Sequence, residues 1–151
     1  MSRQLRIAVL FVLLLLSSRA YAMYDMCFAS AAEQYKISER LLRVIAKDES
    51  NFNPAAINWN ANGSYDFGVM QINSSWYKTL GPEQWSRLGD PCVNIYTGAG
   101  ILAGCIGRFG YSWEAVGCYN AVSSGKRKNY AWKIYKALSK KQSPIPGPAR
   151  R

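Results

Sequence analysis

The stretch that decides the fold runs from Ser38 to Pro54 and reads S-E-R-L-L-R-V-I-A-K-D-E-S-N-F-N-P. Ser38 is a favourable N-cap residue and predicts a helix from Glu39 to about Glu49. The apolar residues of this segment recur at the spacing of one helix face: Leu41, Leu42, Ile45 and Ala46. Pro54 follows soon after and ends the helical pattern. The stretch therefore predicts an amphipathic helix that leads into a polar turn.

Glu49 has the position expected of a general acid. It follows Ile45 by 4 residues and Leu42 by 7, so it lies on the apolar face of the predicted helix. Desolvation on that face and the nearby helix C-terminus both disfavour the charged carboxylate, and both raise its pKa. A glutamate with a raised pKa can donate a proton near neutral pH. The structural alternative is a helix-end glutamate paired with a nearby Lys or Arg.

A second carboxylate, Asp66, follows a predicted β-hairpin. Residues 57–67 are rich in turn formers, and Asn62-Gly63 is a strong hairpin signal. Asp66 lies 17 residues after Glu49, on the far side of this hairpin. Glycoside cleavage uses two carboxylates in different surroundings, one as the acid and one as an ionised stabiliser or nucleophile. The alternative role for Asp66 is to cap the turn.

Helical patterns dominate the rest of the chain. We expect helices over residues 23–35, 91–109, 113–121 and 126–140. Asp90-Pro91 is a cap followed by a proline at the first helical position, and Gly110 stops the helix that begins there. Ser112 can cap the next helix. The predicted fold class is therefore α+β and mainly helical, with a small β-hairpin beside the helix that carries Glu49.

The chain has four cysteines, and an even number in an exported chain predicts two disulfides. Cys92 and Cys105 are 13 residues apart on one predicted helix. That spacing separates them by roughly 20 Å, too far for a bridge. Two pairings remain. The preferred one joins Cys27 to Cys92 and Cys105 to Cys118, because the latter two flank the turn of a helical hairpin. The other joins Cys27 to Cys105 and Cys92 to Cys118.

The first 22 residues have the pattern of a secretory signal peptide. Arg3 and Arg6 form a basic region, residues 7–16 are apolar, and Ala20-Tyr21-Ala22 is a cleavage site. Cleavage would leave one domain over residues 23–141 and a Pro-rich tail over residues 142–151, which we expect to be extended or disordered. The predicted location is the periplasm.

The composition limits the partners and the kinds of catalytic site that we expect. Removal of the signal peptide would leave 16 Lys and Arg against 9 Asp and Glu, a net charge of +7, which suits an acidic polymer. Nucleic acid is not an expected partner, because residues 126–128 form the only dense basic cluster. The chain has no histidine and no CxxC pair, so we expect no metal site and no Ser-His or Cys-His nucleophile. No cofactor is predicted.

Three ordered motifs stand out in the chain: Glu49–Pro54 (E-S-N-F-N-P), Gly68–Asn73 (G-V-M-Q-I-N) and Ala115–Ala121 (A-V-G-C-Y-N-A). They resemble the motifs of the lytic transglycosylases of the goose-type and soluble-lytic-enzyme fold. Residues 62–68 are also similar to the hairpin of C-type lysozymes, with Asp66 in the place of its carboxylate. The resemblance covers roughly residues 24–138. It implies a lysozyme-like domain that cleaves the glycan strand of peptidoglycan without a cofactor.

The resemblance also implies roles for single residues. Glu49 would be the acid and then the base. The residues expected around it are Ser50, Gln71, Asn73, Tyr119 and Asn120. Ser50 would orient Glu49 or a substrate group, and Gln71 and Asn73 would line the cleft near an N-acetyl group. Tyr119 would stand close to Glu49 and tune it, with Asn120 positioning the adjacent loop. Val122 departs from the family pattern, which has glycine there, so we expect the following loop to differ in shape.

Small exported relatives of this kind accompany type III secretion, conjugation and type IV pilus systems, and their pattern also favours the Cys27–Cys92 bridge. A component of such an apparatus is therefore an expected partner, and the protein is expected to be a monomer. The resemblance favours a lyase that forms a 1,6-anhydromuramoyl end. The alternatives are a hydrolytic muramidase that uses Glu49 with Asp66, and a peptidoglycan-binding subunit without turnover.

Overall fold

The computed structural model describes residues 25–140, which fold into helices around a small sheet. Residues 25–35 are helical, as expected. Ser38 caps α2 (Glu39–Ser50), its hydroxyl accepting a hydrogen bond from the backbone of Leu41. The predicted signal peptide and the Pro-rich tail lie outside the described residues. No helix within residues 25–140 is long and apolar enough to cross a membrane.

The predicted hairpin is part of a three-stranded antiparallel sheet. Strand β1 (Ile57–Trp59) pairs with β2 (Tyr65–Phe67), and β2 pairs with β3 (Ile72–Asn73). In this register Asp66 lies opposite Asn73. The third strand is too short to have a pattern of its own in the sequence. The sheet connects the end of α2 to the following helices.

Two elements after the sheet were not expected from the sequence. They are η1 (Ser74–Trp76), a single 3-10 turn, and α3 (Tyr77–Ser86). Within α3, Gly81 has a φ of 78° and precedes Pro82, so the segment is two helical pieces joined at a kink. Glycine adopts this conformation without steric cost, and proline starts a helix but disrupts its interior. These two residues hide the helical pattern.

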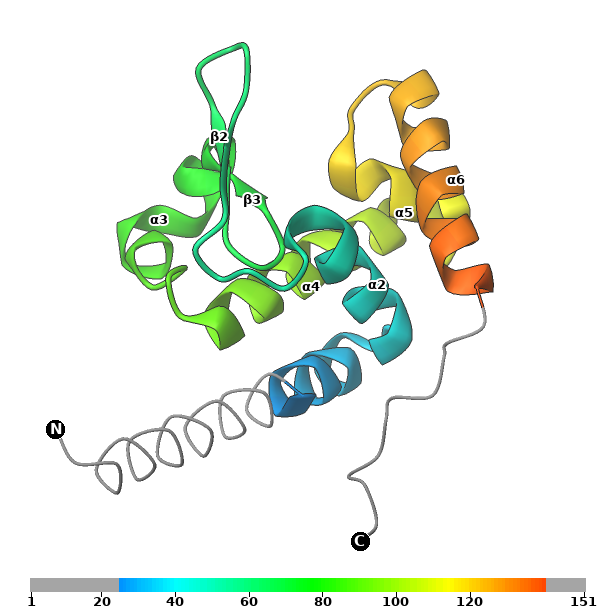
Figure 1. Cartoon of the computed structure of the whole chain (residues 1–151), viewed down its shortest axis with the longest axis horizontal. Helices are drawn as coiled ribbons and strands as arrows, with labels where there is room; N and C mark the ends of the chain where they lie inside the picture. Colours follow the sequence, from blue (N-terminus) through cyan, green and yellow to red (C-terminus); the bar gives the residue numbers. More distant parts are fainter. Residues whose placement is uncertain (1–24, 141–151) are drawn as a thin grey trace, which may run out of the picture.

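The remaining helices begin and end close to the expected positions. Asp90 caps α4 (Pro91–Phe109), and Ser112 caps α5 (Trp113–Asn120). Helix α6 (Ser124–Ser139) begins two residues before the predicted start. Figure 1 shows the sheet and α3 on one side of the molecule and α5 with α6 on the other, with α2 and α4 between them. The mainly helical α+β fold is thus as expected.

The core lies where α2, α4 and the sheet loop meet. The sheet loop is the segment between β2 and β3, residues 68–71. Its largest fully buried side chains include Phe28, Leu42, Ile45, Met70 and Leu102. Two disulfides tie this core to its periphery: Cys27–Cys92 joins the first helix to α4, and Cys105–Cys118 joins α4 to α5. This is the pairing that the sequence analysis preferred. The bridges hold the two sides of the molecule to the central helix α4.

Candidate active site

Glu49 lies in the last turn of α2, where its carboxyl group is half-buried. The hydroxyl of Tyr130, on α6, donates a hydrogen bond to Glu49 Oε1 at 2.6 Å. The apolar face of α2 directs Glu49 inward, and the packing of α6 against α2 brings Tyr130 to it. A carboxyl oxygen that accepts a short hydrogen bond is held in one orientation. The arrangement therefore fixes where a proton on Glu49 would point.

The surroundings of Glu49 raise its pKa from 4.5 to about 7. Burial is the largest cause, because it disfavours the charged form. The hydrogen bond from Tyr130 and the charge of Lys133 lower the pKa, whereas the charges of Asp48 and Asp66 raise it. Lys133 Nζ is itself paired with Asp48 at 2.8 Å, so much of its charge is already balanced. Glu49 thus keeps a substantial protonated fraction at neutral pH, as a general acid requires.

Tyr119 lies near Glu49 but makes a different contact. Its hydroxyl donates a hydrogen bond to the backbone carbonyl of Met70 at 2.6 Å. Burial, followed by the charges of Glu49 and Asp66, raises the pKa of Tyr119 well above its usual value. It is therefore a neutral donor that fastens α5 to the sheet loop. The tyrosine that bonds directly to Glu49 is Tyr130, which the sequence analysis did not assign.

Ser50 joins the end of α2 to the loop that follows β2. Its hydroxyl lies 2.8 Å from the carbonyl of Val69 and 3.3 Å from that of Ala46. Immediately after it, Asn51 and Phe52 have positive φ values of 52° and 64°. This left-handed turn is uncommon for residues other than glycine, and it ends the helix abruptly. Ser50 therefore ties the end of α2 to the loop that follows β2.

Gln71 and Asn73 belong to a hydrogen-bonded network on the sheet. Gln71 Nε2 donates to the carbonyls of Gly68 at 2.9 Å and Ala56 at 3.2 Å. Gln71 Oε1 accepts from Asn58 Nδ2 at 2.6 Å. These hydrogen bonds hold the Gln71 side chain in place. The backbone of Gln71 has a positive φ of 48°.

Asp66 is held by two amides. Asn73 Nδ2 donates to Asp66 Oδ1 at 2.7 Å, and Asn60 Nδ2 donates to Oδ2 at 3.0 Å. Both carboxylate oxygens thus have a donor, so the orientation of the Asp66 side chain is fixed. The charge of Asp66 makes only the smallest contribution to the raised pKa of Glu49, which is due mainly to burial. The two carboxylates that the sequence singled out therefore have different environments.

The end of the third motif is more open than the rest of the site. Asn120 is the last residue of α5 and is exposed. Val122, where the family pattern has glycine, is 90% exposed, and its carbonyl accepts a hydrogen bond from Arg127 Nε at 2.9 Å. Because the Val122 side chain points to solvent, valine in place of the family's glycine does not displace Glu49 or Tyr130.

Asn94 is a second residue of the site region that the sequence analysis missed. It is only 1% exposed, and its Oδ1 accepts from the Met70 backbone at 2.8 Å. Its Nδ2 donates to the carbonyls of Phe67 and Leu88. A side chain built on Gly68 would collide with this amide, because its Cβ would lie 2.3 Å from Asn94 Nδ2. The sequence signal that could have identified Asn94 is its position as a polar residue among the apolar residues of α4.

Aromatic side chains form a row beside the sheet. The rings of Trp59 and Tyr65 lie 5.0 Å apart, and Tyr65 contacts Trp85, which contacts Tyr77. Trp59 is 74% exposed and therefore available to a ligand, whereas Trp76 packs against the core. Among residues 25–140, no cluster of three or more His, Cys, Asp or Glu side chains could hold a metal ion.

A mainly helical domain with a small antiparallel sheet and a half-buried glutamate at the end of α2 has the architecture of a lysozyme-like domain. The model of the family described as "Transglycosylase SLT domain" matches residues 26–142. The chain belongs to this family.

Curated relatives agree with the family match. The chain is 44% identical over 121 residues to the invasion protein IagB of Salmonella typhimurium, covering 76% of each chain. It is 40% identical over 117 residues to the protein IpgF of Shigella flexneri, covering 73% of this chain and 77% of IpgF. It is also 40% identical over 121 residues to the X polypeptide of Escherichia coli, covering 73% of this chain and 70% of that protein. The similarity thus extends over most of each of these proteins.

Proposed function

We propose that this protein is a peptidoglycan lytic transglycosylase that uses Glu49 first as an acid and then as a base. Membership in the transglycosylase SLT family supports lytic transglycosylase activity. The observation that carries the assignment of Glu49 is its half-buried carboxyl group, which has a pKa of about 7 and a 2.6 Å hydrogen bond from Tyr130. A carboxyl group poised near neutral pH can give up a proton and later take one back.

In the proposed reaction, protonated Glu49 donates its proton to the glycosidic oxygen between N-acetylmuramic acid and N-acetylglucosamine. The bond from the muramoyl C1 to that oxygen breaks, and N-acetylglucosamine leaves with the proton as its hydroxyl group. The Glu49 carboxylate then removes the proton of the muramoyl 6-hydroxyl, whose oxygen bonds to C1. This gives a 1,6-anhydromuramoyl end without consuming water. The Tyr130 hydroxyl stabilises the carboxylate between the two steps.

The other motif residues have supporting roles in this proposal. Gln71 and Asn73 line the cleft near the N-acetyl group, and Asn120 positions the loop beyond α5. Ser50 and Tyr119 act by holding the backbone around Glu49, a role supported by their hydrogen bonds to the carbonyls of Val69 and Met70. No metal or cofactor takes part.

A hydrolytic muramidase is the second candidate, and Asp66 is the observation that favours it. With both oxygens held by Asn60 and Asn73, the Asp66 carboxylate suits the role of a fixed negative charge that stabilises an oxocarbenium ion. Water would then complete the reaction in place of the 6-hydroxyl group. A third candidate is a peptidoglycan-binding subunit without turnover.

We propose further that the protein is exported to the periplasm after cleavage of residues 1–22. The two disulfides support export, because such bridges persist in oxidising compartments. There it would open the cell wall locally for a secretion, conjugation or pilus apparatus and could dock on one of its components. The similarity to a protein named for invasion supports such a role.

The test is the substitution Glu49→Gln, which keeps the shape of the side chain but removes the acid. We expect clearing of purified sacculi in a zymogram to fall by at least about 100-fold, with binding to sacculi retained in a pull-down. Glu83→Gln, the same change at an exposed position of α3, is the matched control and should clear as the wild type does. Clearing by Glu49→Gln at the wild-type rate would refute the assignment of Glu49.

The products decide between the two catalytic candidates. Mass spectrometry of the released muropeptides should find 1,6-anhydro ends if the enzyme is a lyase and reducing ends if it is a hydrolase. A wild-type protein that binds sacculi but releases nothing would instead indicate the binding subunit.

A further inference from the structure

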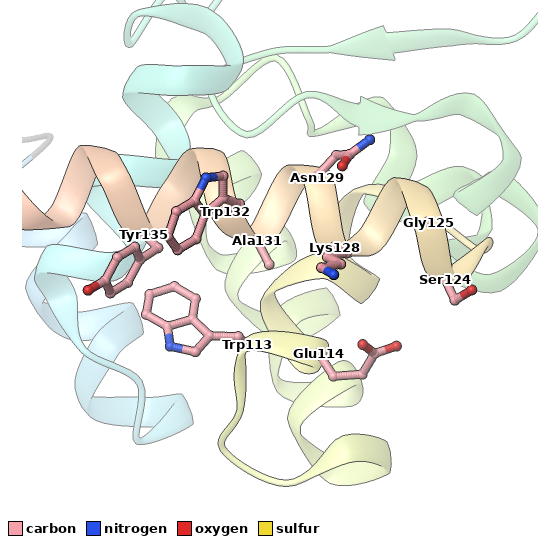
Figure 2. A pocket seen from close by; sticks show the side chains of 9 residues that line it. All are labelled: Trp113, Glu114, Ser124, Gly125, Lys128, Asn129, Ala131, Trp132 and Tyr135. Carbon is pink, nitrogen blue, oxygen red and sulfur yellow. The ribbon is translucent and has the colours of Figure 1, made fainter.

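An aromatic groove of about 730 Å³ lies on the side of α6 that faces away from Glu49. It is lined by the start of α5 and by one face of α6, including Trp113, Glu114, Ser124, Lys128, Trp132 and Tyr135. Figure 2 shows Trp113, Trp132 and Tyr135 gathered at one end of this groove and Ser124 at the other. Helix α6 thus has two different faces, one toward Glu49 and one toward the groove.

Helix geometry keeps the groove separate from the candidate active site. Each residue turns an α-helix by about 100°, so Trp132 lies roughly 200° around α6 from Tyr130. Tyr130 and Ile134 are buried toward α2 and the core, whereas Trp132 and Tyr135 are exposed. A ligand in the groove would therefore not touch the Glu49 carboxyl group.

The groove presents an unusual amount of aromatic surface to solvent. Trp113, Trp132 and Tyr135 are 45%, 56% and 41% exposed. The rings of Trp132 and Tyr135 stack 5.1 Å apart, and Trp113 meets Tyr135 edge-on at 5.2 Å. Ring contacts hold all three side chains in place without covering them. A preformed apolar surface of this kind indicates a binding site.

We propose that the chain's own proline-rich segment, residues 143–148 (S-P-I-P-G-P), folds back along α6 and docks in this groove. Proline-rich segments adopt the polyproline II helix and are bound by grooves lined with aromatic side chains. That helix has three residues per turn, so Ile145 and Pro148 share one edge of it. This apolar edge is the part that would lie against Trp132 and Tyr135.

The segment has the reach and the length that docking requires. Tyr135 is one helical turn before Ser139, where α6 ends, so the aromatic end of the groove lies next to the start of the tail. Residues 140–142 are available to reverse the chain direction. Six residues in a polyproline II helix span about 19 Å, and the α6 residues from Ser124 to Tyr135 span about 17 Å. The segment therefore matches the groove in length.

The charges along the groove suit an uncharged occupant. Lys128 lines the groove, and Lys136 lies 5.3 Å from the centre of the Trp132 ring. Residues 142–149 carry no charge, so they meet no repulsion from these lysines. Glu114, the acidic residue among those that line the groove, is paired with Arg127 at 2.8 Å.

Covalent connection makes docking effective even when the contacts are weak. A short linker gives a tethered segment an effective concentration on the order of millimolar. A segment whose dissociation constant as a free peptide is about 1 mM would thus occupy the groove about half of the time. The tail can therefore cover the aromatic surface without a large interface.

The experiment uses the full chain after signal-peptide removal and the indole N–H resonances of its tryptophans in two-dimensional NMR. We expect Ile145→Ser with Pro148→Ser to shift the Trp113 and Trp132 resonances and to leave those of Trp59, Trp76 and Trp85 unchanged. Gln142→Ser with Ala149→Ser is the matched control, two serines outside the docked segment, and should shift none of them. Conversely, Trp132→Ala should shift the backbone amides of Ile145 and Gly147, and Trp59→Ala should not.

Three results would overturn the proposal. One is the same Trp113 and Trp132 resonances in the wild type and in the Ile145→Ser, Pro148→Ser variant. Another is a difference that grows with protein concentration, which would mean that the tail occupies the groove of a second copy. The third is an equal shift of both resonances in wild type and variant on addition of soluble glycan strands, which would mean that the groove is an open sugar site.

Discussion

Two tyrosines near Glu49 make different hydrogen bonds. Tyr130 donates to the carboxyl oxygen itself, whereas Tyr119 donates to the Met70 carbonyl in the adjoining loop. Burial raises the pKa of both phenols, so both stay neutral donors over the range in which Glu49 titrates. Tyr130 therefore acts on the proton affinity of Glu49, and Tyr119 acts on the position of the backbone. The hydrogen bond from Tyr130 opposes the effect of burial by favouring the carboxylate.

Tyr130→Phe should raise the pKa of Glu49 further. The lost hydrogen bond stabilised only the ionised form, so the protonated form persists to higher pH. The fall in activity with rising pH, expected near pH 7 in the wild type, should move upward by about one unit in the variant. The measurement is the pH profile of kcat/KM on soluble glycan strands. Tyr135→Phe, on the groove side of the same helix, should keep the wild-type profile; a Tyr130→Phe profile that also matches it would refute this role.

At the scale of elements, Asn94 joins helix α4 to the sheet. Its one side chain satisfies the Met70 N–H and the carbonyls of Phe67 and Leu88. Gly68 permits the close approach, because any side chain there would overlap the Asn94 amide. Gly68–Asn73, a motif in the sequence, is thus shaped by a residue more than 20 positions further along. The loop that carries Gln71 depends on α4 for its conformation.

Asn94→Leu should therefore destabilise the domain by about 2–4 kcal/mol, because buried backbone groups lose their partners. The free energy of unfolding in urea measures this. Asn129→Ala, at an exposed position of α6, should change stability by less than about 0.5 kcal/mol. An Asn94→Leu protein as stable as the wild type would mean that the loop finds other hydrogen-bond partners.

At the scale of the whole molecule, the two disulfides close loops of very different length. Cys27–Cys92 spans 65 residues and holds the first helix to α4, whereas Cys105–Cys118 spans 13. Each pair has one buried cysteine, Cys27 in the first and Cys105 in the second. Replacing either pair by alanine therefore leaves a cavity of similar size. The main difference lies in the unfolded chain, whose entropy a longer closed loop reduces more.

Replacing both cysteines of the long loop, Cys27→Ala with Cys92→Ala, should lower the free energy of unfolding by about 4 kcal/mol. Replacing both cysteines of the short loop, Cys105→Ala with Cys118→Ala, should lower it by about 3 kcal/mol. Urea unfolding of the two double variants under oxidising conditions makes the comparison, and each variant serves as the control for the other. A larger loss from the short loop would mean that native contacts of α5 matter more than chain entropy.

Local patterns in the sequence predicted most of the elements. The Ser38, Asp90 and Ser112 caps begin three helices as expected, because a cap acts within one turn of the chain. The position of Glu49 on the apolar face of α2 predicted a raised pKa for the same reason. Helix α3 was missed because Gly81 and Pro82 interrupt its pattern.

The sequence by itself determined which carboxyl group faces the core, because that follows from helix periodicity alone. Only the tertiary structure decided that its partner is Tyr130, 81 residues away, and that Tyr119 bonds to Met70 instead. Both tyrosines lie on helices, and no local rule distinguishes them. The choice depends on how α5 and α6 pack against α2 and the sheet loop, and packing is a property of the whole folded chain.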